Sequence, residues 1–260
     1  MNRTIPPIPR RRVLMITALA LVIVFLLWNN PLRWGVIDLI MSPLRLFVTF
    51  IHEASHSLAA LISGGEVLKF QVSADGSGVA TTAGGSRALI LAAGYLGAAL
   101  FGSVLFFVVN RMPRYIDMIA FALGMFMIGF TLMFALPDQS GNPLAMVLGI
   151  GFGALLIFLG AKANLIVDLL VLNVLAVMTA LNAVFDVWGD LVTYGDTFSR
   201  FGVRTDAIAF SQDIAPILPP VLVGIIWSAL AVVMLGISAY YALWKPLHAE
   251  VNEAYQRVRE

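Results

Sequence analysis

The stretch FVTFIHEASHSLAALISGG, residues 47–65, carries three titratable side chains inside an apolar run. His52, Glu53 and His56 lie within five consecutive positions, although the chain has only three histidines in all. Residues four apart share one face of a helix, so both imidazoles can point at one place. The role of these side chains depends on whether the run is buried in lipid, and the composition bears on that question.

The composition indicates a polytopic membrane protein. Hydrophobic residues make up 60% of the 260 residues and charged residues only 12%, and the mean hydropathy is +0.92. A soluble domain is about half apolar and about a quarter charged. The net charge of +1 and the lack of a basic aromatic patch give no sign of a nucleic-acid partner. Without cysteine, a metal ion would be held by nitrogen and oxygen.

Uncharged runs long enough to cross about 30 Å of hydrocarbon recur along the chain. They predict about seven transmembrane helices, at residues 13–29, 44–63, 88–109, 116–136, 143–160, 164–188 and 216–244. We therefore expect an all-α polytopic membrane protein with a single membrane-embedded domain, residues 13–244. A cytoplasmic tail, residues 1–12, precedes it, and a polar tail, residues 245–260, follows it.

The orientation is only partly consistent with the positive-inside rule. Three consecutive arginines, residues 10–12, predict a cytoplasmic amino terminus. If the second run crosses the membrane, residues 64–87 lie in the cytoplasm, and Arg111 and Arg114 lie on the opposite face, against that rule. We expect an integral multi-pass protein of a bacterial plasma membrane.

The segment GGEVLKFQVSADGSGVATTAGG, residues 64–85, differs from the long apolar runs. Val67–Val72 and Gly78–Thr82 are rich in β-branched and apolar residues and flank Asp75-Gly76, which is typical of a β-hairpin. A two-stranded hairpin is marginally stable alone in water. We expect a short hairpin at about residues 65–86, after the second span, that packs on the membrane helices.

Gly94, Gly97 and Gly102 recur within the third run, and more glycines follow in GIGFGALL from Gly149. Small residues at such spacings let membrane helices approach closely. We interpret these glycines as packing residues.

The His-Glu-x-x-His pattern is typical of a zinc site. Two histidines at this spacing suit a tetrahedral ion with open positions, with Glu53 as base to a bound water. Zinc lowers the pKa of such a water from about 15.7 to about 7, and Glu53 would pass the proton on to the leaving amine. Core histidines beside an incidental glutamate are the plainer interpretation. However, three ionisable groups in one turn are hard to keep in a membrane without a cation.

Such a site needs a third protein ligand, and His248 lies in the polar tail. The segment LIVDLLVLNVLAVMTALNAVFDVWGDL, residues 165–191, supplies carboxylates. On one continuous helix Asp168, Asp186 and Asp190 fall near one face. Asp168 lies roughly 27 Å from Asp186 along that axis, at the opposite interface. Asp186 and Asp190 both remain candidates, and depth in the membrane favours Asp186.

On these residues the chain resembles the site-2 protease class of intramembrane zinc metallopeptidases, and most of all its small branch without an inserted domain. The resemblance covers FIHEASHSLAALISGG, SADGSGVATT, AAGYLGAAL and NAVFDVWGDL. The family pattern has an asparagine and, eight positions on, an Asp-Gly pair. The resemblance thus implies that Asp190 is the third zinc ligand and that Asn182 contacts the substrate or the oxyanion. Leu191 stands where the family has glycine, so Asp186 is kept beside Asp190.

The resemblance has two further implications. It implies that the hairpin lies near the active site and offers a strand edge to the substrate. Pairing with an edge would satisfy the backbone of an unwound transmembrane segment. The segment RTDAIAF, with Asp206, also looks familial, but it suggests no chemistry at this stage.

The residues and the resemblance together predict a zinc metalloendopeptidase that hydrolyses a peptide bond in or next to a transmembrane segment of a client protein. Its partners would be that membrane-protein substrate and the lipid bilayer. One alternative is a non-catalytic scaffold or pseudoprotease, against which the intact Glu53 weighs. The other is a proton or ion transporter with Glu53, Asp168, Asp186 and Asp190 as a relay, although no inverted pair of broken helices supports it.

Overall fold

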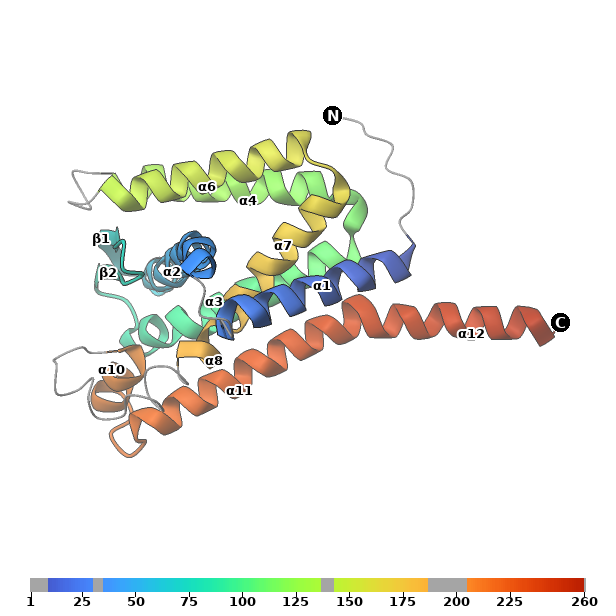
Figure 1. Ribbon diagram of the computed structural model, residues 1–260. Coiled ribbons are helices and arrows are strands. Elements are labelled where there is room, and N and C mark those ends of the chain that lie inside the picture. The colour runs from blue at the N-terminus through green and yellow to red at the C-terminus, as the bar shows by residue number, and fades with distance from the viewer. Residues whose placement is uncertain (1–8, 30–34, 137–142, 187–204, 260) are drawn as a thin grey trace.

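The structure is a computed structural model that describes residues 9–29, 35–136, 143–186 and 205–259 (Figure 1). In these ranges the chain is helical apart from one antiparallel hairpin of two strands. The predicted all-α membrane fold with a short hairpin is confirmed.

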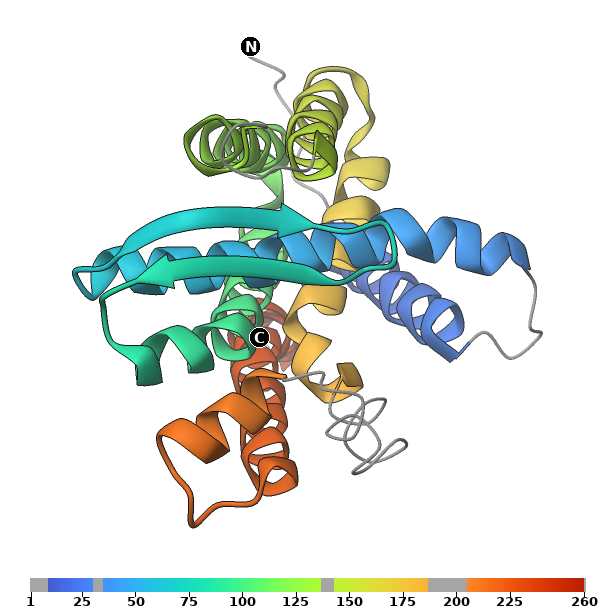
Figure 2. The same cartoon turned by 90° about the vertical axis from the view of Figure 1, so that its left-hand side faces the viewer.

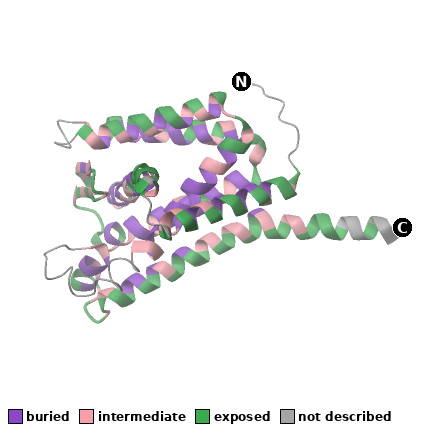
Figure 3. Ribbon diagram, in the orientation of Figure 1, coloured by how far each residue is buried: buried purple, intermediate pink, exposed green. Residues whose placement is uncertain are grey.

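In the described part of the chain, five helical segments are long and apolar enough to cross a membrane. They are α1 (Arg10–Asn29), α3 (Arg87–Arg111), α4 (Ile116–Phe134) with the 3-10 turn η1 (Pro113–Tyr115) before it, α6 (Pro143–Lys162), and α11 (Pro220–Ala239) with its continuation. That continuation is the π-helical turn η3 (Tyr240–Trp244) and α12 (Lys245–Arg259). Large apolar side chains are exposed on the outward faces of these helices, as expected for contact with lipid (Figure 3). The predicted count of seven spans is not confirmed.

Helix α2 (Gly35–Ile62) runs across the membrane-length helices rather than along them. Figure 1 shows α4 and α6 from the side and α2 nearly end-on, whereas Figure 2 shows α2 lengthwise. The chain therefore does not pass back through the bundle between α1 and α3. Arg10 lines the same cavity as Arg111 and Arg114, so the expectation that those two arginines lie opposite the amino terminus is wrong.

The hairpin packs on the helices as expected. β1 (Glu66–Val72) pairs with β2 (Gly78–Ala83), with an irregularity between Val67 and Lys69. Figure 2 shows both strands lying along α2. The fully buried Phe70 of β1 contacts Phe50 of α2 and Phe130 of α4, with ring centroids 5.0 and 5.1 Å away. These edge-to-face contacts anchor the hairpin.

Two of the three glycines of α3 serve close packing. A Cβ at Gly102 would lie 2.3 Å from the backbone nitrogen of Ala180, and one at Gly97 would lie 2.7 Å from Cβ of Ser55. These contacts are closer than real Cβ atoms show, so glycine is what lets α3 approach α7 and α2. Gly94 instead faces the imidazoles of His52 and His56.

The sixth predicted span is not one helix. α7 (Leu165–Ala180) ends one residue before Leu181, and α8 (Asn182–Asp186) follows as a separate short helix. The predicted common face of Asp168 and Asp186 assumed a continuous helix, and the break at Leu181 removes that basis. Asp168 lies in the first turn of α7 and is buried.

A buried cluster of amide and hydroxyl groups joins three helices. The hydroxyl of Thr17 in α1 donates to Oδ1 of Asn110 in α3, at 2.6 Å. Asn110 Nδ2 donates to Oδ1 of Asn173 in α7, at 2.6 Å, and to the carbonyl of Phe106, at 2.8 Å. Asn173 Nδ2 donates to the carbonyl of Leu169, at 2.8 Å. We call Thr17, Asn110 and Asn173 the amide cluster.

Candidate metal centre

Helix α2 brings the three titratable residues of the His-Glu-x-x-His motif together on its buried side. Glu53 and His56 are 7% and 6% exposed, and the His52 side chain is 13% exposed. The serines of the same segment turn back on the helix: the hydroxyls of Ser55 and Ser57 donate to the carbonyls four residues earlier. Of the buried polar side chains of α2, those of Glu53 and His56 are therefore the ones not bonded to the backbone of their own helix.

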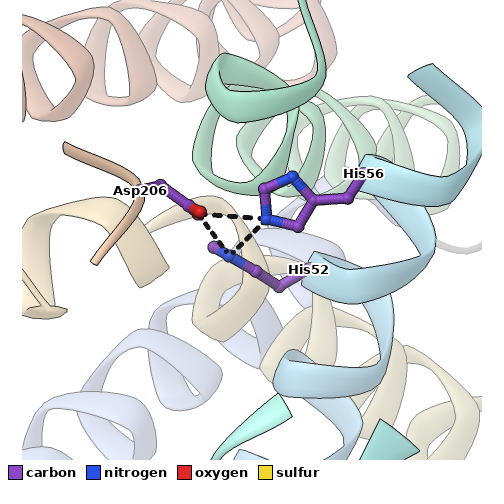
Figure 4. Close-up of side chains that lie close together, drawn as sticks. All are labelled: His52, His56 and Asp206. Atoms are coloured by element: carbon purple, nitrogen blue, oxygen red, sulfur yellow. Dashed lines mark hydrogen bonds and ion pairs between the residues drawn. The ribbon is translucent and has the colours of Figure 1, made fainter. Parts of the chain in front are cut away.

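A carboxylate from a distant part of the chain completes a cluster with the two histidines (Figure 4). Asp206 is the first residue of α10 (Asp206–Asp213), a short helix whose N-cap is the side chain of Thr205. Its Oδ2 lies 2.9 Å from Nε2 of His52 and 3.0 Å from Nε2 of His56, and the two Nε2 atoms are 3.2 Å apart. We call His52, His56 and Asp206 the metal cluster.

These distances fit a zinc ion. Ligand atoms at about 2.0–2.1 Å around a tetrahedral ion lie about 3.3 Å from one another, close to the three distances found. A Cβ at Gly94 of α3 would lie 2.4 Å from Nε2 of His56 and 2.5 Å from Nε2 of His52. The absence of a side chain at Gly94 therefore leaves space directly in front of both nitrogens, which is where a shared ion would be held.

The surroundings of His56 fix which of its nitrogens is free to bind. Its Nδ1 lies 2.6 Å from the backbone carbonyl of Ile90, which can only accept a hydrogen bond. Nδ1 therefore carries a proton, and Nε2 is the nitrogen that faces the cluster and can bind a metal ion. A carbonyl behind a histidine is the usual support of a metal ligand. His52 instead contacts the ring of Tyr95, edge to face, with centroids 4.8 Å apart.

Two carboxyl groups have lowered pKa values, that of Asp206 in the cluster and that of Asp75 in the hairpin. Burial alone would raise the pKa of Asp206, but hydrogen bonds and charge interactions with His52 and His56 lower it well below its usual value. The pKa of Asp75, in the exposed hairpin turn, is lowered because the backbone N–H and the hydroxyl of Ser77 donate to its carboxylate. Asp206 is therefore anionic, the state in which a carboxylate binds a metal ion.

Strand β2 packs directly against Glu53. A Cβ at Gly78 would lie 2.6 Å from Cγ and from Oε1 of Glu53. The backbone N–H of Ala80 donates to the Glu53 carboxylate. Because successive N–H groups of a strand point to opposite edges, Gly78 and Thr82 direct theirs the same way as Ala80. The outer edge of β2 therefore faces the motif.

A cavity of about 740 Å³ connects these residues with the surface. Exposed Arg45 and Asp75 line it, and so do the buried Glu53 and Asn182. Water can reach Glu53 along this polar path. Asn182, the predicted substrate contact, is thus part of the same cavity as the motif.

The structure brings together some of the predicted site residues and not others. His52, Glu53 and His56 share the site. Asp186 lines the cavity but is not one of the three residues whose ligand atoms lie within 4.8 Å of one another. Asp190 lies outside the described residues. The residue in the position predicted for a third ligand is Asp206.

Sequence reasoning missed the part that Asp206 and Gly94 play in this site. Asp206 is 154 residues from His52, and no helical spacing relates the two. The local signal available was the Thr-Asp pair in RTDAIAF. Such a pair indicates the start of a helix, with the threonine as its cap, and not a metal ligand. Gly94 was interpreted as a packing residue, because only the tertiary structure shows that imidazoles face it.

Comparison with known proteins gives one match. A family model described as Peptidase M50B-like matches residues 16–238. No curated protein and no solved structure gives a significant match to the chain. The matched range runs from within α1 almost to the end of α11, so the likeness covers the whole bundle and not only the histidine motif.

Proposed function

Because the chain belongs to the Peptidase M50B-like family, we propose that it is a zinc-dependent endopeptidase that cuts a client protein in or next to a transmembrane segment. The family and the membrane-length helices support an integral membrane metallopeptidase. The metal, the reaction and the class of client are the new parts of the proposal. The plasma membrane of a bacterium stays the predicted location.

The metal cluster would hold the ion. His52 and His56 offer Nε2 atoms, and Asp206 offers an anionic oxygen, all within 4.8 Å of one another. A zinc ion bound there would polarise the scissile carbonyl and acidify a water molecule at neutral pH. Asp186 lines the cavity at a distance, and Asp190 keeps the ligand role only as a prediction.

Glu53 would act as the general base and then as the general acid. It is adjacent to His52 in the chain and lines the same cavity. Its carboxylate would accept a proton from the attacking water and deliver it to the nitrogen of the leaving amine. The N–H of Ala80 supports this carboxylate from one side and keeps it aimed into the cavity.

The outer edge of β2 offers a place for the substrate backbone. A transmembrane helix hides its peptide groups in its own hydrogen bonds, so it must unwind before it is cut. An extended segment can then pair with the edge that carries Ala80 and pass beside Glu53. Asn182, on the cavity wall, is placed to donate to the substrate or to the oxyanion, the role the resemblance implies.

One observation carries the proposal: two imidazole nitrogens face the space that Gly94 leaves open, with a carboxylate oxygen of Asp206 within 4.8 Å of both and a buried glutamate next to His52 in the chain. The transporter alternative needs a chain of carboxylates, but Asp168 is not among the described residues that line the cavity with Glu53. A non-catalytic scaffold would have no use for Glu53, which is buried and lines the cavity that reaches the surface.

The decisive experiment is a Glu53→Gln variant of the full chain, with Glu66→Gln, at an exposed position of β1, as the matched control. We expect zinc content to be unchanged and cleavage of a model transmembrane substrate to fall by about 10²–10⁴-fold. Cleavage that survives the substitution would remove the mechanism. A wild-type protein without stoichiometric zinc would favour the scaffold or the transporter.

A further inference from the structure

Two adjoining cavities lie at the end of the bundle where α1 begins and α3 ends, away from the metal cluster. The first, of about 710 Å³, is bounded by α1, α3, α11, η3 and α12. The second, of about 1010 Å³, is bounded by α1, α3, η1, η3 and α12. Both are lined by Arg10, Phe107, Arg111 and Glu250, so they form one continuous region.

The lining of this region is strongly basic. Its charged side chains are Arg10, Arg11, Arg111, Arg114, Lys245 and a single acidic residue, Glu250. Glu250 pairs with Arg10 at 2.5 Å. In the described ranges no carboxylate forms an ion pair with any of the other four basic residues. The region therefore has an excess of positive charge that an anion would neutralise.

An apolar groove continues from the basic region. It has a volume of about 520 Å³ and runs between α1 and the junction of α11 with η3. Leu14 and Leu243 line both the groove and the second basic cavity. A Cβ at Gly236, which lines the groove, would meet nothing within 4 Å. The groove is thus open space beside charged side chains, and it suits an amphiphile rather than a small ion.

The turn that separates α11 from α12 lines all three cavities. η3 is a π-helical turn, Tyr240–Trp244. It contributes Tyr241 to the first cavity, Leu243 to the second, and Tyr240 and Trp244 to the groove. π-Helical turns are rare and recur at functional sites. Basic side chains beside aromatic rings at one level are also typical of the membrane interface.

We propose that this region binds an anionic phospholipid. The phosphate would lie among Arg10, Arg111 and Lys245, and an acyl chain would lie in the groove beside Leu14 and Gly236. Guanidinium groups form paired hydrogen bonds with phosphate oxygens, and basic pockets between membrane helices bind anionic headgroups. These basic side chains are not simply those found at every helix end on this side of the bundle. Lys162 lies near the same end, since Gly160 contacts Asp117, yet it does not line these cavities.

The test compares lipids bound to the full chain in detergent by native mass spectrometry. Dioleoyl phosphatidylglycerol and dioleoyl phosphatidylcholine are the probes, because they share acyl chains and differ in headgroup charge. We expect the anionic lipid to bind more tightly. The double variant Arg111→Gln/Lys245→Gln should weaken its binding by about 25-fold, or about fivefold for each charge. Lys162→Gln, at the same end, should change it less than about twofold.

A second pair of variants tests the groove. Gly236→Leu fills it and should weaken phosphatidylglycerol binding by about fivefold or more. Gly151→Leu is the matched control, since a Cβ there also meets nothing within 4 Å, and it should have no effect. Equal affinities for the two lipids, or equal losses in Lys162→Gln and the double variant, would overturn the proposal. Displacement of the lipid by excess inorganic phosphate, with no effect of Gly236→Leu, would assign the region to a free anion instead.

Discussion

Two buried polar clusters lie among the apolar helices, and they are built in opposite ways. In the amide cluster, the side-chain nitrogens of Asn110 and Asn173 both donate to oxygens, and no member titrates near neutral pH. In the metal cluster, the ligand atoms of two imidazoles and one carboxylate all lie within 4.8 Å of one another. The hydrogen bonds of the first are complete within the protein, whereas the second has three ligand atoms that converge as in a cation site.

This difference distinguishes polar side chains that hold the helices of a membrane protein together from polar side chains that bind a ligand. Groups that satisfy one another hold helices together and gain nothing from a ligand. Groups that converge beside an open space are expensive to keep unless something binds there. Substitutions in the two clusters should therefore have separable effects on chemistry and on stability.

The largest effect is expected from Gly94→Ala. The new Cβ would occupy the space in front of both Nε2 atoms. Zinc should be lost, and cleavage should fall by about 10³-fold or more, because electrostatic activation and proton transfer disappear together. Zinc content and cleavage rate check this, with Gly151→Ala as control, since a Cβ there meets nothing within 4 Å. Full zinc occupancy in Gly94→Ala would show that the ion does not lie there.

Asp206→Asn tests the third ligand. Loss of a direct ligand should weaken zinc binding by more than the roughly 10–100-fold that a supporting residue contributes. Asp186→Asn should change zinc affinity little, because Asp186 lines the cavity without joining the cluster. Competition with a chelator measures all of these affinities. If Asp190→Asn, and not Asp206→Asn, releases the metal, the assignment drawn from the geometry is wrong.

Gly78→Ala is expected to affect the base without affecting the metal. Its Cβ would overlap Cγ and Oε1 of Glu53 and displace that side chain. A misplacement of about 1 Å can cost about 10²-fold in rate, so cleavage should fall by up to that factor while zinc stays bound. Reduced zinc in this variant would mean that the two parts of the site are not independent.

Asn173→Leu should have the smallest effect, and only on stability. Hydrogen bonds between membrane helices contribute about 0.6 kcal/mol on average and up to about 1.7 kcal/mol. We expect a loss of about 1 kcal/mol in unfolding free energy, with zinc content and cleavage per folded molecule unchanged. Asn110→Leu/Asn173→Leu should cost less than the sum of the single variants, because each leaves the other amide without its partner. Additive losses would show that the two amides act separately.

The sequence was sufficient for the local features and insufficient for those made by distant segments. The hairpin was predictable because Asp75-Gly76 and the flanking β-branched residues act locally. The histidine pair was predictable because its spacing defines a helix face. In contrast, the crosswise course of α2 depends on how it packs between the hairpin and the other helices, and hydropathy does not report direction.

The third ligand shows the same limit. Depth in the membrane, counted along an assumed continuous helix, favoured Asp186, and the break at Leu181 invalidates that assumption. Asp206 comes from a short helix held against α3, where Arg87 pairs with Asp213. Only the folded chain brings this helix to the histidines. Gly94 was recognisable as a small residue, but its role depends on which side chains face it.

The crosswise course of α2 has a consequence for any client that is cut at this site. Because α2 runs across the membrane-length helices, a bilayer crossed by those helices would hold the whole of α2 at nearly one depth, and Thr49, Glu53 and His56 with it. The scissile bond would then be selected by its height above the membrane midplane more than by the side chains around it. Clients of unrelated sequence should be severed at a common distance from the bilayer surface.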